Sequence, residues 1–218
     1  MILSIHIPKT SGLSIRNLLK QHYGAGFVLA GGIPADVPAM ARCIHGHFAA
    51  ASLMARFPTA RLITWVRDPV DRVISSYYHG PGESNGAHPD GGAERFQGLP
   101  LLEFAALPQQ RNEMTRCFGR MRPSDFAFIG IVERPDRSLA RLRTFLGGGL
   151  APWADAGSES EPLTPRYAVD SGTRAAIAGL NHPDIEWYRE CVERDDRAPA
   201  NSPSLSPWAG SWREATGT

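Results

Sequence analysis

Four residues that can bind an anion lie within six positions near the start of the chain. Lys9 is followed by the hydroxyls of Thr10, Ser11 and Ser14. Gly12, inside this group, lets the backbone approach a ligand closely. A helix that begins here adds free backbone N–H groups, which favour negative charge. The segment therefore predicts a binding site for a phosphate or a sulfonate group.

The segment does not fit the Walker A loop of ATP-binding proteins, in which a glycine precedes Gly-Lys-Ser/Thr by about four residues. Here Ile7 and Pro8 come directly before Lys9. The alternative without a ligand is an ordinary strand-to-helix turn with Lys9 at the surface. The concentration of hydrogen-bond donors favours the anion site over such a turn.

A second candidate anion site lies at Arg67, the last residue of the most strand-like run in the sequence. Open α/β sheets bind ligands at the carboxyl ends of their strands, where Arg67 would lie. Ser75, eight residues on, adds a hydroxyl about two turns into the next helix. Arg72 is a further candidate. The alternative is a structural ion pair of Arg67 with Asp68 or Asp71.

Two histidines, His45 and His47, form the third candidate feature. Residues two apart in a strand point to the same side, so both imidazoles can face one pocket. Histidine is a natural general base for an alcohol because its usual pKa is near neutral. Cys43 has the same parity, which makes zinc binding an alternative, although no fourth ligand lies nearby in the sequence. A pair of purely structural histidines is the other alternative.

Two strand–helix units would position these residues. A buried strand is predicted over residues 1–7, and an amphipathic helix over residues 13–22. The clearest strand covers residues 61–67, and an Asp-Pro pair after it suits the start of a helix over residues 70–79. Two such units in a short chain indicate a parallel α/β sheet.

The rest of the chain continues this alternation. Beyond a loop over 24–38 with a short strand at 27–29, we expect a strand over 41–48, helices over 49–57 and 100–120, a strand over 126–132, and helices over 137–145, 171–180 and 182–194. Residues 80–98 form a long Gly- and Pro-rich loop of the kind that covers substrates. One domain over 1–197 is followed by a Pro- and Ser-rich tail over 198–218, which we expect to be poorly ordered.

Overall composition restricts the class of partner. The chain has 218 residues and a formal net charge of +1, which gives no general case for binding nucleic acid or a membrane surface. Its three cysteines indicate a reducing compartment rather than a disulfide scaffold. Neither a signal peptide nor a membrane-spanning run is recognisable, so we expect a cytoplasmic protein without a membrane span.

Several of these segments resemble motifs of the sulfotransferases that use 3′-phosphoadenosine 5′-phosphosulfate (PAPS). Residues 8–14, Pro-Lys-Thr-Ser-Gly-Leu-Ser, resemble their 5′-phosphosulfate loop. Residues 67–78, which begin Arg-Asp-Pro and include Ser75, resemble their 3′-phosphate motif. Residues 45–48, His-Gly-His-Phe, resemble the His-x-His segment of the carbohydrate branch that contains the heparan and uronyl 2-O-sulfotransferases. Residues 129–134 are similar to a later strand of the same group.

The resemblance implies a role for each matched position. Lys9 would contact the oxygen that bridges phosphate and sulfonate and stabilise charge on the leaving group. His47 would take the proton of the acceptor hydroxyl, with His45 assisting or holding the acceptor. The residues implied to hold the 5′-phosphate are Thr10, Ser11, Gly12, Leu13 and Ser14, and those implied to hold the 3′-phosphate are Arg67 and Ser75.

The resemblance also implies a three-layer α/β sandwich with a central parallel sheet, the P-loop-kinase-like sulfotransferase fold. We expect sulfonate transfer from PAPS to an acceptor hydroxyl, on a carbohydrate rather than a small phenol, with no metal required. Arg111, Asn112 and Arg116 either bind an acidic acceptor or form a solvated helix face.

Family members from secretory compartments carry a membrane anchor and disulfides. Neither is evident in this sequence, so we expect a cytoplasmic, bacterial enzyme. Two rival predictions remain on the same fold. One is a nucleotide-dependent kinase, and the other is a nucleotide-binding protein without catalytic activity.

Overall fold

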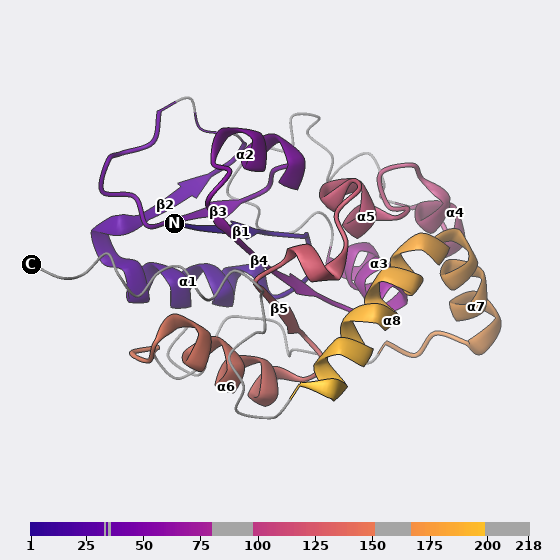
Figure 1. Cartoon of the computed structure of the whole chain (residues 1–218). Coiled ribbons are helices and arrows are strands. Elements are labelled where there is room, and N and C mark those ends of the chain that lie inside the picture. Colours follow the sequence, from indigo (N-terminus) through magenta and orange to yellow (C-terminus); the bar gives the residue numbers. More distant parts are fainter. Residues whose placement is uncertain (33, 35, 80–97, 151–166, 199–218) are drawn as a thin grey trace, which may run out of the picture.

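Five parallel strands form one central sheet in the computed structural model, which describes residues 1–32, 34, 36–79, 98–150 and 167–198 (Figure 1). The strands are β1 (Ile2–Ile5), β2 (Phe27–Ala30), β3 (Cys43–Gly46), β4 (Arg61–Val66) and β5 (Phe128–Ile131). Their order is β2-β3-β1-β4-β5, and every neighbouring pair is parallel. The predicted α/β fold with a parallel central sheet is confirmed, with β1 at its centre.

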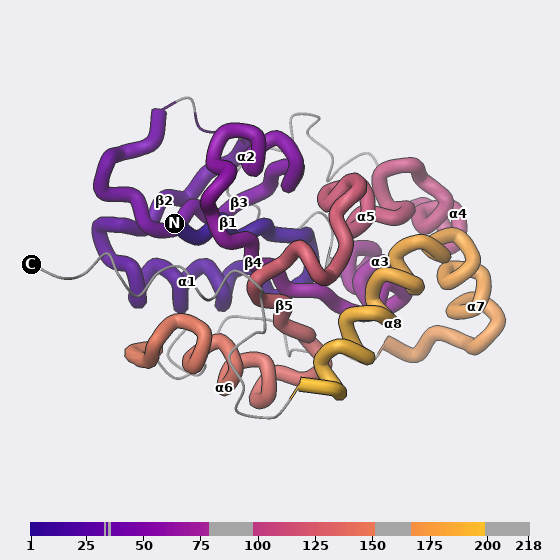
Figure 2. The backbone as a smooth tube through the Cα atoms, in the orientation of Figure 1, coloured from indigo at the N-terminus to yellow at the C-terminus, as the bar shows by residue number. Residues whose placement is uncertain are grey.

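Helices cover both faces of the sheet. They are α1 (Gly12–Tyr23), α2 (Ala50–Arg56), α3 (Pro69–His79), α4 (Leu101–Ala106), α5 (Glu113–Phe118), α6 (Pro135–Leu146), α7 (Ser171–Leu180) and α8 (His182–Arg197), with short 3-10 helices at Gly24–Gly26 and Pro123–Asp125. α1 and α6 lie on one side of the sheet, and α2, α5 and α8 lie on the other (Figures 1 and 2). The arrangement is the predicted three-layer sandwich.

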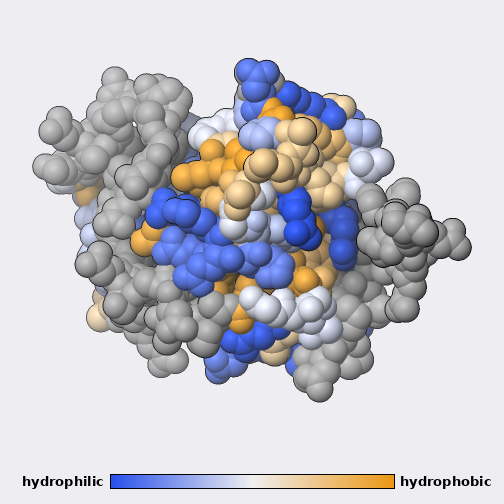
Figure 3. Space-filling view, turned by 90° about the vertical axis from the view of Figure 1, so that its left-hand side faces the viewer, coloured by the Kyte–Doolittle hydropathy of each residue, from blue (hydrophilic) through white to orange (hydrophobic). Residues whose placement is uncertain are grey.

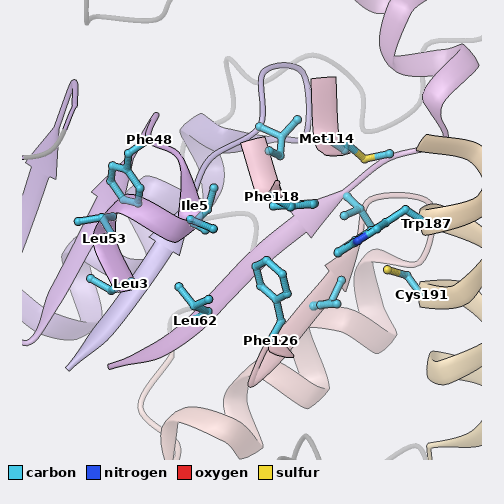
Figure 4. Packing of buried hydrophobic residues seen from close by; sticks show 14 of the residues in the cluster. Leu3, Ile5, Phe48, Leu53, Leu62, Met114, Phe118, Phe126, Trp187 and Cys191 are labelled. Carbon is cyan, nitrogen blue, oxygen red and sulfur yellow. The ribbon is translucent and has the colours of Figure 1, made fainter. Parts of the chain in front are cut away.

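Alternation along β1 explains why the strand is central. Leu3 and Ile5 belong to the buried cluster that α2, α5 and α8 share, to which Phe118 and Trp187 add aromatic rings (Figure 4). Ile2 belongs to the second cluster, which α1 and α6 complete. Successive side chains of a strand point to opposite faces, so β1 is held between both helical layers. Burial of each large apolar side chain is worth about 1.5–3 kcal/mol.

The helix after β4 begins as its sequence predicts. Asp68 Oδ1 accepts hydrogen bonds from the backbone N–H groups of Val70 (2.9 Å) and Asp71 (3.0 Å). Pro69 occupies the first helical position, where its missing N–H costs nothing. Only two residues separate the end of β4 from the capped helix, so Arg67 lies at the carboxyl end of that strand.

Residues 100–120 were predicted to be helical, and the structure has two short helices there, α4 and α5, with a break between them. Asn112 adopts a left-handed backbone with φ of 51° and turns the chain before α5. Asp184 of α8 then accepts hydrogen bonds from two backbone N–H groups of α5, at 3.0 and 2.8 Å. The break therefore depends on a residue about seventy positions away, which local periodicity does not reveal.

Two predictions lie mainly outside the described residues, namely the loop over 80–98 and the tail over 198–218. Within the described part of the chain, no helix is both long and apolar enough to cross a membrane. The face of the molecule in Figure 3 carries hydrophobic residues interrupted by hydrophilic ones.

Candidate functional site

Three candidate segments follow the carboxyl ends of three neighbouring strands. They are the loop over residues 6–11 after β1, His47 after β3, and Arg67 after β4. The chain leaves β1 toward β2 on one side and leaves β4 toward β5 on the other. Such a switch in strand order opens a crevice at the carboxyl ends, where α/β sheets bind ligands.

The loop after β1 has an unusual backbone. Lys9 and Ser11 adopt left-handed conformations with φ of 67° and 61°. Each such residue other than glycine costs roughly 1–3 kcal/mol, and such strain is concentrated at functional sites. The Thr10 hydroxyl donates a hydrogen bond to the Ile7 carbonyl (2.7 Å) and so stabilises the turn. The loop is therefore held in a strained shape by its own contacts.

α1 begins at Gly12, directly after this loop. The side chain of Ser11, at the N-cap position, makes no capping hydrogen bond. The first N–H groups of a helix have no partner within the helix, and together with the helix dipole they attract anions. Ser14, in this first turn, is buried. The N-terminus of α1, beside Lys9, thus has the features that suit binding of an anion.

Arg67 connects the second candidate site to the first. Its Nη1 donates a hydrogen bond to the Lys9 carbonyl (3.2 Å), and the residue is buried. Its Nε is buried and has no hydrogen-bond partner among the described residues. Buried donors in proteins nearly always have an acceptor, so this nitrogen indicates an acceptor that the described residues do not supply. The structure therefore brings Arg67 and the Lys9 loop together.

The predicted alternative for Arg67, an ion pair with Asp68 or Asp71, does not occur. Asp68 caps α3, and Asp71 pairs with Arg174 of α7 at 2.7 Å. Arg72 is fully buried and pairs with Glu113 at 3.2 Å, so it supports the fold rather than the site.

Ser75 lies two turns along α3 and is completely buried. Its hydroxyl is therefore not displayed at the protein surface in this structure. A contact with a phosphate would need the ligand to reach below that surface.

His45 is anchored inside the protein. It lies opposite Ser4 in the β1–β3 register, and its Nδ1 is 2.9 Å from Ser4 Oγ. Only 2% of the residue is exposed. Burial, with smaller effects of His47 and Arg16, lowers the pKa of His45 to about 3. The imidazole is therefore neutral at working pH and is a weak base.

His6 is the residue that the sequence analysis missed. Its ring stacks on His45 with centroids 5.4 Å apart and lies 4.3 Å from the His47 ring. A histidine at the end of a largely apolar run, three positions before Lys9, was the available signal. The contacts with residues about forty positions away could not be predicted from it.

The carboxyl ends of β4 and β5 are joined by Glu133. Its Oε1 accepts a hydrogen bond from the Asp68 backbone N–H, and its Oε2 accepts one from the Tyr188 hydroxyl, both at 2.9 Å. Burial raises the pKa of Glu133, and these hydrogen bonds oppose the rise. Glu133, which follows β5, thus holds the backbone next to Arg67 in place and is itself held by Tyr188 of α8.

Arg111 and Arg116 are two of the residues considered for binding an acidic acceptor. Arg116 donates to the backbone carbonyls of Pro108 and Gln109 and pairs with Glu113, so it closes a turn. Arg111 is exposed. Among the described residues, no group of three His, Cys, Asp or Glu side chains is arranged to hold a metal, which leaves the zinc alternative without support.

No protein-family model matches the chain, and no curated protein matches it either. Among solved structures, the chain is similar to the crystal structure of mouse sulfotransferase SULT7A1 complexed with PAP, with 12% sequence identity and a TM-score of 0.47. The match covers 85% of this chain but only 66% of that chain, so this chain spans just under two thirds of its neighbour. A similarity of this extent assigns no function, which must therefore be argued from the residues of the site.

Proposed function

We propose that this protein is a PAPS-dependent sulfotransferase that transfers a sulfonate group to a hydroxyl of an acceptor. The observation that carries the proposal is the junction of the two anion-binding segments, because Arg67 reaches the Lys9 carbonyl from the neighbouring strand. Two separate anion sites at one edge of the sheet suit a donor with phosphates at both ends of a nucleoside.

The residues present fit such a donor. Arg67 has an orphaned Nε, and the side chain of the N-cap residue Ser11 makes no hydrogen bond to the start of α1. In this proposal Lys9 and the loop N–H groups hold the phosphosulfate, and Arg67 holds the 3′-phosphate. Thr10 acts through its backbone, because its hydroxyl bonds to Ile7. PAPS would supply the sulfonate and a nucleotide leaving group.

Lys9 and His47 have different chemical roles in this proposal. Sulfuryl transfer, like phosphoryl transfer, depends on positioning and on stabilising charge at the leaving oxygen, which is the role of the Lys9 ammonium. An imidazole nitrogen of His47 takes the proton of the acceptor hydroxyl. His45 is the weaker candidate for that base, because burial lowers its pKa to about 3.

A carbohydrate hydroxyl is the proposed acceptor, on the basis of the His-x-His segment at residues 45–47. An alcohol has a far higher pKa than a phenol and so needs a base close to the reacting oxygen.

A thermal melt tests the donor. The chain is heated with 3′-phosphoadenosine 5′-phosphate, with 5′-AMP and with ATP–Mg²⁺. A ligand at 100 times its dissociation constant stabilises by about 2.7 kcal/mol. We expect this stabilisation only with the 3′-phosphorylated nucleotide, and we expect Arg67→Ala to abolish it while exposed Arg143→Ala in α6 preserves it. A response to ATP–Mg²⁺ alone would indicate a kinase instead.

Transfer itself is measured as release of 3′-phosphoadenosine 5′-phosphate from PAPS in the presence of neutral and uronic-acid polysaccharides and of 2-naphthol. Release that depends on a polysaccharide supports the proposal. Nucleotide binding without release with any acceptor would indicate a binding protein that lacks turnover.

A further inference from the structure

His6 occupies the centre of the histidine cluster. It follows β1 directly, and its ring lies between the start of α1 and the two histidines of the β3 segment. A methyl group on Gly12 would lie 1.7 Å from His6 Nε2, 2.0 Å from Cε1 and 2.4 Å from Cδ2. These distances place the methyl group over the ring, so a face of the imidazole, at Nε2, lies against the Gly12 backbone.

The His6 ring makes its contacts through its faces. One face covers the Gly12 backbone, and the ring is tilted by 35° relative to that of His47. It is nearly parallel to the His45 ring, at an angle of 18°. His6 is thus arranged to pack against the neighbouring backbone and imidazoles.

We propose that His6 is a positioning residue whose flat ring, held against Gly12, fixes the orientation of the His47 imidazole. The inference rests on the proposed function, in which His47 takes the proton of the acceptor. His6 would then support both the Lys9 loop and His47. It lies three residues before Lys9 and packs on Gly12, the first residue of α1.

The surroundings of His6 suit such a contact. The charged or titratable groups that face it are His45 and His47 from the β3 segment and Arg16 from α1. Burial lowers the pKa of His6 well below its usual range, and these three groups lower it further. The ring is therefore neutral at working pH and can pack against His47 without charge repulsion.

Two substitutions separate positioning from chemistry. His6→Phe keeps a flat ring and removes both nitrogens, whereas His6→Ala removes the ring. The direct readout is the His47 Cε1–H resonance of the full-length protein, assigned by its loss in His47→Gln and measured with 3′-phosphoadenosine 5′-phosphate present. We expect His6→Phe to retain the ring-stacked position of that signal and His6→Ala to shift it toward the value of a free histidine.

Kinetics give the second readout, with PAPS as donor and the best polysaccharide acceptor. A misplaced catalytic group can cost about 100-fold in rate. We expect kcat to fall at least about tenfold in His6→Ala with little change in KM for PAPS, and to stay within about threefold in His6→Phe.

Each other outcome has a definite meaning. An unchanged His47 signal in His6→Ala overturns the positioning role. An equal loss of turnover in both variants overturns it as well, because it assigns chemistry to a His6 nitrogen. Should His6→Ala not fold, His6→Leu provides volume without a flat ring and must show the same shift. Absence of nucleotide binding by the wild-type protein contradicts the proposed function alone, because the His47 signal still reports on His6.

Discussion

Lys9 combines a strained backbone with the charge that the proposed reaction needs. Its φ of 67° lies in the region that glycine adopts at little cost, so Lys9→Gly removes strain together with the ammonium. We predict that Lys9→Gly leaves the free energy of unfolding unchanged or raises it by up to about 1 kcal/mol, while kcat falls at least about 100-fold. Urea denaturation and PAPS turnover measure the two effects.

Lys20 is the matched control. It is an exposed lysine in the last turn of α1, where glycine is unfavourable. Lys20→Gly should lower the free energy of unfolding by about 1 kcal/mol and leave turnover intact. A Lys9→Gly protein that keeps its activity would remove Lys9 from the mechanism.

His45 makes stability depend on pH. Its pKa is lowered from 6.5 in the unfolded chain to about 3 in the folded protein, chiefly by burial. Between these values the unfolded state binds a proton that the folded state does not, so stability falls as pH decreases below about 6.5. We predict that this histidine alone costs about 2 kcal/mol between pH 7.5 and pH 5.

Urea denaturation at the two pH values, with wild-type protein and His45→Gln, measures that contribution. Glutamine can still bond to Ser4 but does not titrate. The loss between pH 7.5 and pH 5 should be smaller in His45→Gln by about 2 kcal/mol. An identical loss in both proteins would mean that His45 titrates normally in the folded state.

At the level of elements, the start of α1 depends on Gly12, which has no side chain. Alanine is favoured over glycine in helices, yet a methyl group at Gly12 would lie 1.7 Å from His6. We predict that Gly12→Ala lowers the melting temperature and weakens binding of 3′-phosphoadenosine 5′-phosphate. The double variant with His6→Ala should recover part of the lost stability, because the colliding ring is gone.

Gly179 in α7 provides the comparison, because a methyl group there has no neighbour within 4 Å. Gly179→Ala should raise the free energy of unfolding by about 0.5–1 kcal/mol through helix propensity alone. Equal stabilisation by both alanines, measured by urea denaturation, would show that His6 does not pack on Gly12.

The elements themselves were largely predictable from the sequence. β1 and β4 stand out because both faces are buried, so their sequences are almost continuously apolar. The division between α4 and α5 was not predictable, since Asp184 caps α5 from a distant helix. Local patterns thus determined where elements lie, and tertiary contacts determined how the 100–120 segment is divided.

The candidate site was predictable to a similar degree. Parallel strands place their carboxyl ends at one edge, so the approach of Arg67 to the Lys9 loop follows from the motifs and the fold class. The contact of Arg67 Nη1 with the Lys9 carbonyl agrees with that expectation. The role of His6 could not be predicted, because it arises from ring contacts with His45 and His47 across the sheet.

At the scale of the whole molecule, α8 ties the last helices to the sheet. Trp187 and Cys191 of α8 pack in the core beside Phe126 (Figure 4). The end of the same helix lies against α6, where Asp195 is 3% exposed and contacts three arginines. This helix therefore joins the two layers that cover opposite faces of the sheet.

Asp195 is the residue on which that connection depends. Its Oδ2 lies 2.9 Å from both Arg134 Nη1 and Arg137 Nε, and its Oδ1 contacts Arg141, which is itself buried. Removing one partner of a buried ion pair leaves an uncompensated charge and typically costs about 3–5 kcal/mol. We therefore predict that Asp195→Ala lowers the free energy of unfolding by that amount in urea denaturation.

Asp196, the next residue, shows why burial decides the outcome. It pairs with Arg134 as well, but its side chain is 58% exposed, so water screens the interaction. Asp196→Ala should therefore change stability little, although it removes the same charge one position away. Similar losses in the two variants would mean that net charge matters at the end of α8, whereas a loss confined to Asp195→Ala would show that the buried carboxylate holds α8 to α6.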